Sequence, residues 1–240
     1  MNLKNKKILI TGATGGIGNS LVEKFNSLGS LILATGTNEE KLNNLKKNFP
    51  NLSVKKFKLD EHDKIENFIE DIYKELDGLD ILVNNAGITL PESSLDYSEL
   101  SWEKTFDVNL KAPFFLSQEC VKIMKMNNFG VIINITSINA ELAFPNNPSY
   151  QACKAGLKQL TKSMALDFSK YGIRVNSIGP GYFKTSMTNK SWKNMKRRNM
   201  ISDNTILNRW GTPKDLEGTI IFLSSNASSY ITGQDIYVDG

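Results

Sequence analysis

The sequence predicts a single α/β domain, residues 1–240, built on a parallel β-sheet with helices on both faces. Three observations indicate this fold: short apolar runs alternate with segments of helical period, the runs lack polar–apolar alternation, and 240 residues suit one domain of this class. An apolar run without alternation is typical of a strand that is covered on both faces. The predicted strands are residues 7–11, 31–35, 54–59, 81–84, 131–135, 175–178 and 236–238.

The helices predicted between these strands complete βαβ units, whose crossovers are expected to be right-handed. One long stretch, residues 183–212, contains no predicted strand. Because it follows the carboxyl end of a strand, where α/β folds place functional loops, we expect it to form a substrate lid. The predicted helices are residues 17–27, 39–48, 63–76, 102–125, 150–171 and 213–224.

Composition and charge exclude several other classes of protein. A chain with 40% hydrophobic and 22% charged residues is neither disordered nor a coiled coil. The net charge of +4 is scattered along the chain, so a nucleic-acid partner is not expected. No apolar segment has the length of a signal peptide or a membrane span, which predicts a cytoplasmic protein without a membrane partner. Cys120 and Cys153 are expected to be reduced, and His62, the only histidine, is expected at the surface without a metal.

A glycine-rich turn between the first predicted strand and the first predicted helix can hold a phosphate. Glycine lets the backbone approach a ligand closely, and the helix start presents free N–H groups and the positive end of the helix dipole. A tight turn without a ligand is the alternative, but the position between strand and helix favours a bound pyrophosphate. The predicted contacts from this turn are Gly12, Thr14, Gly15, Gly16, Ile17 and Gly18.

The end of the second predicted strand bears on the choice of dinucleotide. An acidic residue there usually holds the adenosine 2′-hydroxyl, and its charge would repel a 2′-phosphate. The segment up to Thr37 contains no acid, and this favours NADP(H) over NAD(H). No arginine replaces the acid to bind the 2′-phosphate. Asp60, after the third strand, is expected either to accept a hydrogen bond from the adenine amino group or to cap a loop.

Tyr150 and Lys154 are the predicted proton-transfer pair. Residues four apart share one face of a helix, and an ammonium beside a phenol lowers the phenol pKa from about 10. Tyrosine then becomes a usable acid or base, and Ser137 is placed to hold the substrate oxygen. Such a pair alone is more typical of a solvated helix face. Together with the glycine-rich turn, it indicates hydride transfer between a nicotinamide and a carbonyl.

With these motifs the whole chain resembles the short-chain dehydrogenase/reductase family. The resemblance implies a Rossmann-type, doubly wound sheet of seven strands in the order 3-2-1-4-5-6-7. It also implies dimers or tetramers that pack through the helices 102–125 and 150–171. The motifs that support it, in chain order, are Thr11-Gly12 with Gly16 and Gly18, then Asn84-Asn85-Ala86-Gly87, then Asn109, Ser137, Tyr150 and Lys154, and finally Pro180-Gly181.

The resemblance implies a role for each member of the tetrad. Tyr150 is the expected general acid and base, and Lys154 is expected to lower its pKa and to bind the nicotinamide ribose. Ser137 is expected to orient the reacting oxygen, and Asn109 to hold a water that relays protons to Lys154. A nucleotide-sensing regulator without catalysis is disfavoured because all four are present. The cofactor contacts implied outside the glycine-rich turn are Asn85, Ala86, Gly87, Tyr150, Lys154, Pro180 and Gly181.

Two substrate classes fit the resemblance. Residues 181–188 and 209–211 resemble gluconate 5-dehydrogenases and related sugar or polyol dehydrogenases, whereas residues 84–89 and 230–234 also resemble 3-oxoacyl-acyl-carrier-protein reductases. Those reductases commonly offer arginines to the acidic carrier at positions that match Val131 and Tyr171. Neither is basic here, which disfavours capture of a polyanionic carrier and favours a small polar substrate.

The lid holds a cluster of basic residues with two possible roles. They are expected either to attract a carboxylate or phosphate of the substrate or to form a solvated helix face. The residues are Lys193, Lys196, Arg197 and Arg198.

Overall fold

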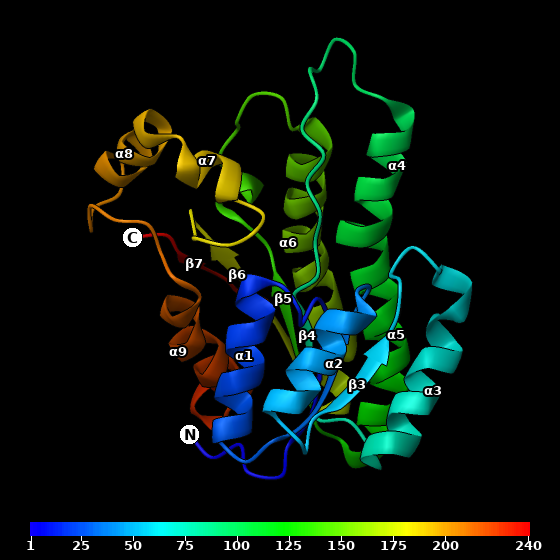
Figure 1. The fold of residues 1–240 in the computed structure, drawn as a ribbon. Helices are drawn as coiled ribbons and strands as arrows, with labels where there is room; N and C mark the ends of the chain where they lie inside the picture. Colours follow the sequence, from blue (N-terminus) through cyan, green and yellow to red (C-terminus); the bar gives the residue numbers. More distant parts are fainter.

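The computed structural model describes residues 1–240 and contains one parallel sheet of seven strands. Their order is β3-β2-β1-β4-β5-β6-β7, with every neighbouring pair parallel, which confirms the predicted topology. Figure 1 shows the helices covering both faces of this sheet. The strands are β1 (Lys7–Ile10), β2 (Leu31–Gly36), β3 (Ser53–Lys56), β4 (Ile81–Asn84), β5 (Gly130–Ile135), β6 (Ile173–Pro180) and β7 (Asp235–Val238).

Nine α-helices and six shorter helical turns connect the strands. None of the helices is long and apolar enough to cross a membrane. The α-helices are α1 (Gly16–Ser27), α2 (Glu39–Asn48), α3 (Ile65–Leu76), α4 (Glu99–Phe106), α5 (Ala112–Met124), α6 (Pro148–Phe168), α7 (Asn189–Lys193), α8 (Met195–Asp203) and α9 (Pro213–Ser224). The shorter turns are η1 (His62–Lys64), η2 (Asp107–Lys111), η3 (Lys125–Asn127), η4 (Ile138–Ala140), η5 (Ser169–Tyr171) and η6 (Asn226–Ser228).

The hydrophobic core forms two layers, one on each face of the sheet. Successive side chains of a strand point to opposite faces, so Ile8 and Ile10 of β1 pack in one layer and Leu9 in the other. The first layer contains buried residues of α1, α2 and α9, and the second contains those of α3, α5 and α6. Burial on both faces explains why the strand sequences are apolar without alternation.

Two of the elements that differ from the sequence prediction are the third strand and the helix predicted over residues 102–125. The third strand ends at Lys56, because the next residues leave the sheet and line a cleft described below. The helix predicted from residue 102 begins at Glu99, after the N-cap Ser98, whose hydroxyl accepts a hydrogen bond from the Ser101 N–H at 3.3 Å. That helix is also interrupted by η2, a π-helical turn. Turns of this kind are frequent at functional sites.

The predicted lid, residues 183–212, contains α7 and α8, and its two ends meet. Lys184 N–H donates to the Gly211 carbonyl at 3.0 Å, and Gly211 N–H donates to the Tyr182 carbonyl at 2.9 Å. Figure 1 shows α7 and α8 at the upper left, above α9 and near the C-terminus. The segment is therefore a compact insertion that enters and leaves the fold at one point.

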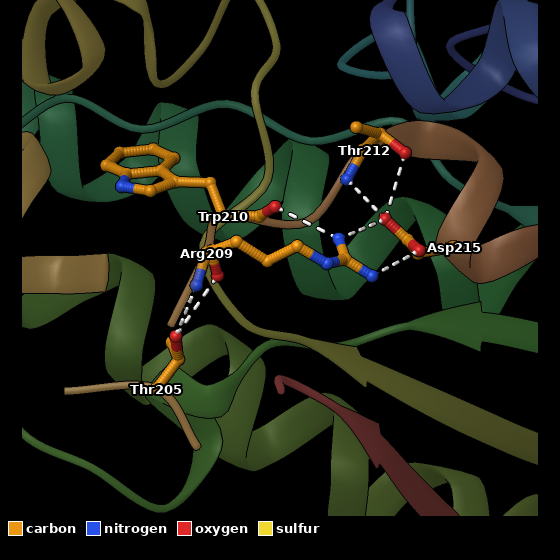
Figure 2. A network of polar contacts seen from close by, with 5 residues as sticks. All are labelled: Thr205, Arg209, Trp210, Thr212 and Asp215. Atoms are coloured by element: carbon orange, nitrogen blue, oxygen red, sulfur yellow. Dashed lines mark hydrogen bonds and ion pairs between the residues drawn. The ribbon is translucent and has the colours of Figure 1, made fainter. Parts of the chain in front are cut away.

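An ion pair anchors the exit of this insertion to α9. Arg209 donates two hydrogen bonds of 2.8 Å to the carboxylate of Asp215, as Figure 2 shows. The same carboxylate accepts from the backbone N–H of Thr212 at 2.7 Å, which completes a capping box at the start of α9. Thr205, within the insertion, accepts from the Arg209 N–H at 3.1 Å.

Candidate active site

The turn between β1 and α1 lies against the end of β4. Gly12 has a φ of +63°, and a Cβ atom there would lie 2.7 Å from the Cα of Ala86, so only glycine fits. Thr11 Oγ1 accepts hydrogen bonds from the N–H groups of Asn85 and Ala86 at 3.0 and 3.1 Å. The Asn85 side chain donates in return to the Thr11 carbonyl at 2.9 Å. The two motifs predicted to bind a cofactor therefore form one continuous backbone surface.

A cleft of about 580 Å³ opens over this surface, within the usual size range of ligand sites. Four of the predicted cofactor contacts, Tyr150, Lys154, Pro180 and Gly181, are outside its lining. The structure brings the other eleven together in this one cleft. They are Gly12, Thr14, Gly15, Gly16, Ile17, Gly18, Thr37, Asp60, Asn85, Ala86 and Gly87.

Pro180 and Gly181 end β6 and pack against the last strand. The Gly181 N–H donates to the Val238 carbonyl at 3.0 Å, and a Cβ atom at Gly181 would lie 2.8 Å from the Cα of Asp239. Close packing against β7 therefore requires glycine here, and contact of these two residues with a cofactor stays a prediction.

The cleft also contains residues that the sequence did not identify. Thr185, at the start of the lid, packs against the glycine-rich turn, since a Cβ atom at Gly16 would lie 3.0 Å from its Cγ2. The predicted motif Pro180-Gly181, a few residues upstream, was the signal that could have identified Thr185, because the chain that follows this motif runs back over the cleft. The other unidentified lining residues are Thr11, Thr35, Gly36, Phe57, Lys58, Leu59, Ile88, Lys104, Val108, Ser186 and Met187.

Tyr150, Lys154 and Ser137 converge at the carboxyl end of β5. Tyr150 and Lys154 lie one turn apart on α6, and Lys154 Nζ is 5.5 Å from the centroid of the Tyr150 ring. Lys154 is buried, and its Nζ donates to the Ile135 carbonyl at 2.7 Å. Ser137 follows β5, and its Oγ exchanges hydrogen bonds of 3.1 Å with Asn139. The predicted grouping of phenol, ammonium and hydroxyl is present.

The acidities of this pair differ from the expectation. Burial raises the pKa of the Tyr150 phenol to about 12, and the contact with the Ser137 side chain only partly opposes this rise. Burial also lowers the pKa of the Lys154 ammonium to about 8. The phenol pKa is therefore raised rather than lowered in this structure, with burial as the largest cause. The lowering expected from Lys154, whose ammonium donates to the Ile135 carbonyl, stays a prediction.

Asn109 lies in the π-helical turn η2 and is fully buried. Its side-chain Oδ1 accepts from the Ile88 N–H at 2.9 Å, and its Nδ2 donates to the Ile88 carbonyl at 2.8 Å. A Cβ atom at Gly87 would lie 3.0 Å from Asn109 Oδ1 and 3.7 Å from Lys154 Nζ. The amide therefore fixes the loop after β4 beside Lys154, and the water relay expected for Asn109 stays a prediction.

Aromatic rings extend from the Tyr150 region into the lid. The Phe144 backbone exchanges hydrogen bonds of 3.1 and 2.6 Å with the side chain of Gln151, next to Tyr150. The Phe144 ring lies 6.0 Å from that of Tyr182, which lies 5.4 Å from Trp210. We call the four rings Phe144, Tyr182, Trp210 and Trp192 the aromatic row; its last two rings are 5.3 Å apart.

Two cations flank the lid end of the aromatic row. Lys184 Nζ lies 4.5 Å from the Trp192 ring centroid, and the Arg198 guanidinium lies 5.2 Å from it. Both distances are typical of cation–π contacts. The other predicted basic residues of the lid, Lys193, Lys196 and Arg197, are exposed. The predicted cluster therefore divides into one cation held at the aromatic row and three that are solvated.

His62 is not the free surface residue that the sequence indicated. Its side chain is 17% exposed, and its Nε2 lies 2.9 Å from Asp107 Oδ1 in η2. The pair connects the segment after Asp60, which lines the cleft, with the turn that holds Asn109. The two partners are 45 residues apart in the chain, so no local pattern in the sequence predicts their contact.

Comparison with known proteins agrees with this geometry. A family model described as Enoyl-(Acyl carrier protein) reductase matches residues 12–240. A 3-oxoacyl-acyl-carrier-protein reductase of Rickettsia bellii is 39% identical over 100% of this chain and 98% of its own length. A gluconate 5-dehydrogenase of Gluconobacter oxydans is 33% identical over 100% and 95%. A gluconate 5-dehydrogenase of Burkholderia cenocepacia, solved with NADP and tartrate, has a TM-score of 0.96 and 33% identity over 100% of this chain and 95% of that one.

Proposed function

Because the chain belongs to the short-chain dehydrogenase/reductase family, an enzyme family that acts on alcohol and ketone groups, we propose that Tyr150 is its general acid and base. The observation that supports this assignment is the convergence of Tyr150, Lys154 and Ser137 beside the glycine-lined cleft. The substrate is a secondary alcohol or its ketone.

The residues of the cleft fit a nicotinamide dinucleotide. A Cβ atom at Gly12 would fill the surface beside Ala86, and α1 begins at Gly16 with its N–H groups toward the cleft, as a bound pyrophosphate requires. When bound, the nicotinamide donates or accepts the hydride. We propose NADP(H) as the preferred form, because neither of the two residues directly after β2, Thr37 and Asn38, is a carboxylate that would repel a 2′-phosphate.

In the reduction direction, Tyr150 Oη donates a proton to the substrate oxygen as negative charge develops there. The Ser137 hydroxyl donates a hydrogen bond to the same oxygen and stabilises that charge in the transition state. The phenolate left on Tyr150 is stabilised by the nearby Lys154 ammonium, so the proton returns in the oxidation direction. Asn109 positions the loop beside Lys154 through Ile88.

We propose a small polar substrate, a sugar acid or polyol of the gluconate type. The aromatic row offers ring faces to the apolar side of a compact sugar, and Lys184 and Arg198 at its end are placed to attract a carboxylate. Val131, at a position where carrier-protein reductases commonly offer an arginine, is fully buried in β5 and presents no side chain to a partner.

A steady-state screen of the purified protein tests this assignment. Both dinucleotides are tested against gluconate-type acids, neutral polyols and acetoacetyl thioesters, and the absorbance of the reduced nicotinamide is followed. We expect turnover of the sugar acids with NADP+ and a lower KM for acids than for neutral polyols. Arg198→Glu should raise KM for the acids alone, whereas Lys196→Glu, the matched control, should leave it unchanged. Equal effects of Arg198→Glu on acids and polyols would contradict the role of that cation.

The second candidate is a 3-oxoacyl-acyl-carrier-protein reductase. It is favoured by identities of 38–40% to reductases of several Rickettsia species over the whole chain. Activity confined to the thioester in the same screen would establish this candidate in place of the sugar dehydrogenase.

We further propose that the enzyme is a cytoplasmic homo-oligomer, a dimer or tetramer. Cys120 and Cys153 are buried and unpaired, as expected in a reducing compartment. A groove lined by apolar residues of α4, η2, α5 and α6 lies on the face predicted to pack between copies. Its apolar residues are Phe106, Leu110, Phe114, Phe115 and Leu160.

A further inference from the structure

One end of the dinucleotide cleft lies where β2 passes into α2. Thr35, Gly36 and Thr37 line it from this side. The neighbouring chain after β3 lines it as well, because Gly36 pairs in register with Lys56 and its carbonyl accepts from the Phe57 N–H at 3.1 Å. This register places Lys58, which also lines the cleft, beside the turn that follows Thr37.

The charges at this end leave one ammonium without a partner. Lys56 is paired with Glu39, the first residue of α2, at 3.3 Å, so that carboxylate is neutralised. Lys58 forms no ion pair and no side-chain hydrogen bond, and it is exposed to the cleft. Asp60, two residues after Lys58 in the chain, lines the cleft as well. The cleft has only one other basic lining residue, Lys104, which belongs to α4 rather than to β2 or β3.

Hydroxyl groups without partners complete the surroundings. Thr35 is 1% exposed, lines the cleft, and its Oγ1 has no hydrogen-bond partner in the protein. A buried polar atom of this kind requires a partner from a ligand or water. A Cβ atom at Gly36 would lie 3.2 Å from Thr14 Oγ1, so this position has little room for an acidic side chain. Hydroxyls and an ammonium suit a phosphate.

We propose that Lys58 is a specificity-determining residue that selects a dinucleotide with a 2′-phosphate on its adenosine. The ammonium takes the place of the arginine that is missing after β2, and it reaches the site from the chain that follows β3. This inference rests on the proposed function, because it assumes that the cleft binds a nicotinamide dinucleotide. It extends that function by naming the residue that distinguishes the two cofactors.

Binding measurements test the inference without turnover. Calorimetry gives the dissociation constants of NADP+, NAD+, adenosine 2′,5′-bisphosphate and 5′-AMP for the wild type and Lys58→Gln. We expect Lys58→Gln to weaken the two 2′-phosphorylated ligands by about 10- to 100-fold, the usual loss for a charge-assisted hydrogen bond. NAD+ and 5′-AMP should bind within about twofold of the wild type, because they do not reach the ammonium. Lys46→Gln, at an exposed lysine of α2 outside the lining of the cleft, is the matched control, and Lys104→Gln tests the other basic lining residue as a rival.

Each outcome decides between the two proposals. A specific loss of 2′-phosphorylated ligands in Lys58→Gln, with the Lys46→Gln control unchanged, establishes the assignment. Equal weakening of all four ligands, a specific loss in Lys104→Gln or Lys46→Gln instead, or preference of the wild type for NAD+ would overturn it and leave the dehydrogenase function intact. Failure of the wild type to bind any dinucleotide would reject the proposed function itself. Lys58 is exposed, so the variant is expected to fold, and its circular dichroism verifies this.

Discussion

At Tyr150, burial and the effect expected from the Lys154 ammonium act on the same proton in opposite directions. Burial holds the phenol protonated with a pKa of about 12, which suits a proton donor to a developing alkoxide. The reverse reaction requires the phenolate, and Lys154 is the cation within reach to stabilise it. At neutral pH the Tyr150 phenol is therefore in its protonated, acid form, and it needs the Lys154 ammonium beside it to act as a base.

Tyr150→Phe is expected to lose turnover by about a hundredfold or more, the usual size of general acid catalysis. The ring still packs in the same place, so dinucleotide binding should be retained. Steady-state kinetics and calorimetry of NADP+ binding measure the two effects separately. Retention of full activity would refute the acid assignment.

Lys154→Met is expected to change how stability depends on pH. In the folded wild type the Lys154 pKa is about 8, below its unfolded value of 10.5, so below pH 8 the folded state bears the full cost of a buried charge. That cost decreases as the pH rises from 8 and is absent above 10.5. The wild type should therefore gain up to about 3 kcal/mol relative to Lys154→Met between these two pH values. Urea unfolding at pH 7, 8, 9 and 10 measures the difference, and a constant gap would contradict it.

At the scale of single elements, the regular strands and helices could be predicted and the local irregularities could not. The sequence of β1 is a continuous apolar run, and the segment after the glycine-rich turn has apolar residues at helical spacing, so the first strand and the first helix could be predicted. The π-helical turn around Asn109 leaves no mark in the sequence, because its extra residue is fixed by the contact of the amide with the Ile88 backbone. The His62–Asp107 pair escaped prediction for the same reason, since tertiary packing creates it.

Asp215→Ala is expected to loosen the exit of the lid and to destabilise α9. Asp215 is the N3 residue of the capping box whose N-cap is Thr212. Loss of a capping interaction typically costs about 1 kcal/mol, and the two hydrogen bonds from Arg209 are lost as well (Figure 2). The guanidinium and the Thr212 N–H hold the pKa of Asp215 well below its ordinary value, so the anchor should weaken only in strong acid. Thermal unfolding and limited proteolysis within residues 183–212 measure the effect. Lys214→Ala, at the exposed neighbour, should behave as the wild type.

At the scale of the whole molecule, the predicted strand order, the layers and the cleft all agree with the structure. Eleven of the predicted cofactor contacts line one cleft, because parallel strands bring their carboxyl ends to one edge of a sheet. The sequence did not identify Lys58, two residues before the predicted contact Asp60, or Thr185, four residues after Gly181, because tertiary packing decides which side chains of a loop face the cleft.

Phe115→Asp is expected to convert the proposed oligomer to smaller species. Phe115 is 36% exposed on α5 and lines the apolar groove, so a carboxylate there would be buried between copies without a partner. Analytical ultracentrifugation measures the mass of the particle. Tyr73→Asp, at an exposed aromatic residue on α3 outside that groove, is the matched control. An unchanged mass for Phe115→Asp would contradict the assignment of this face.

The insertion that carries α7 and α8 begins and ends at one place, where Tyr182, Lys184 and Gly211 exchange backbone hydrogen bonds. Its first residues also line the nucleotide cleft at Thr185, Ser186 and Met187, so a graft has to leave them in place. A chimera that receives only residues 189–203, the span of α7 and α8, from a relative with another substrate should therefore fold and keep its dinucleotide while its substrate range moves toward that of the donor.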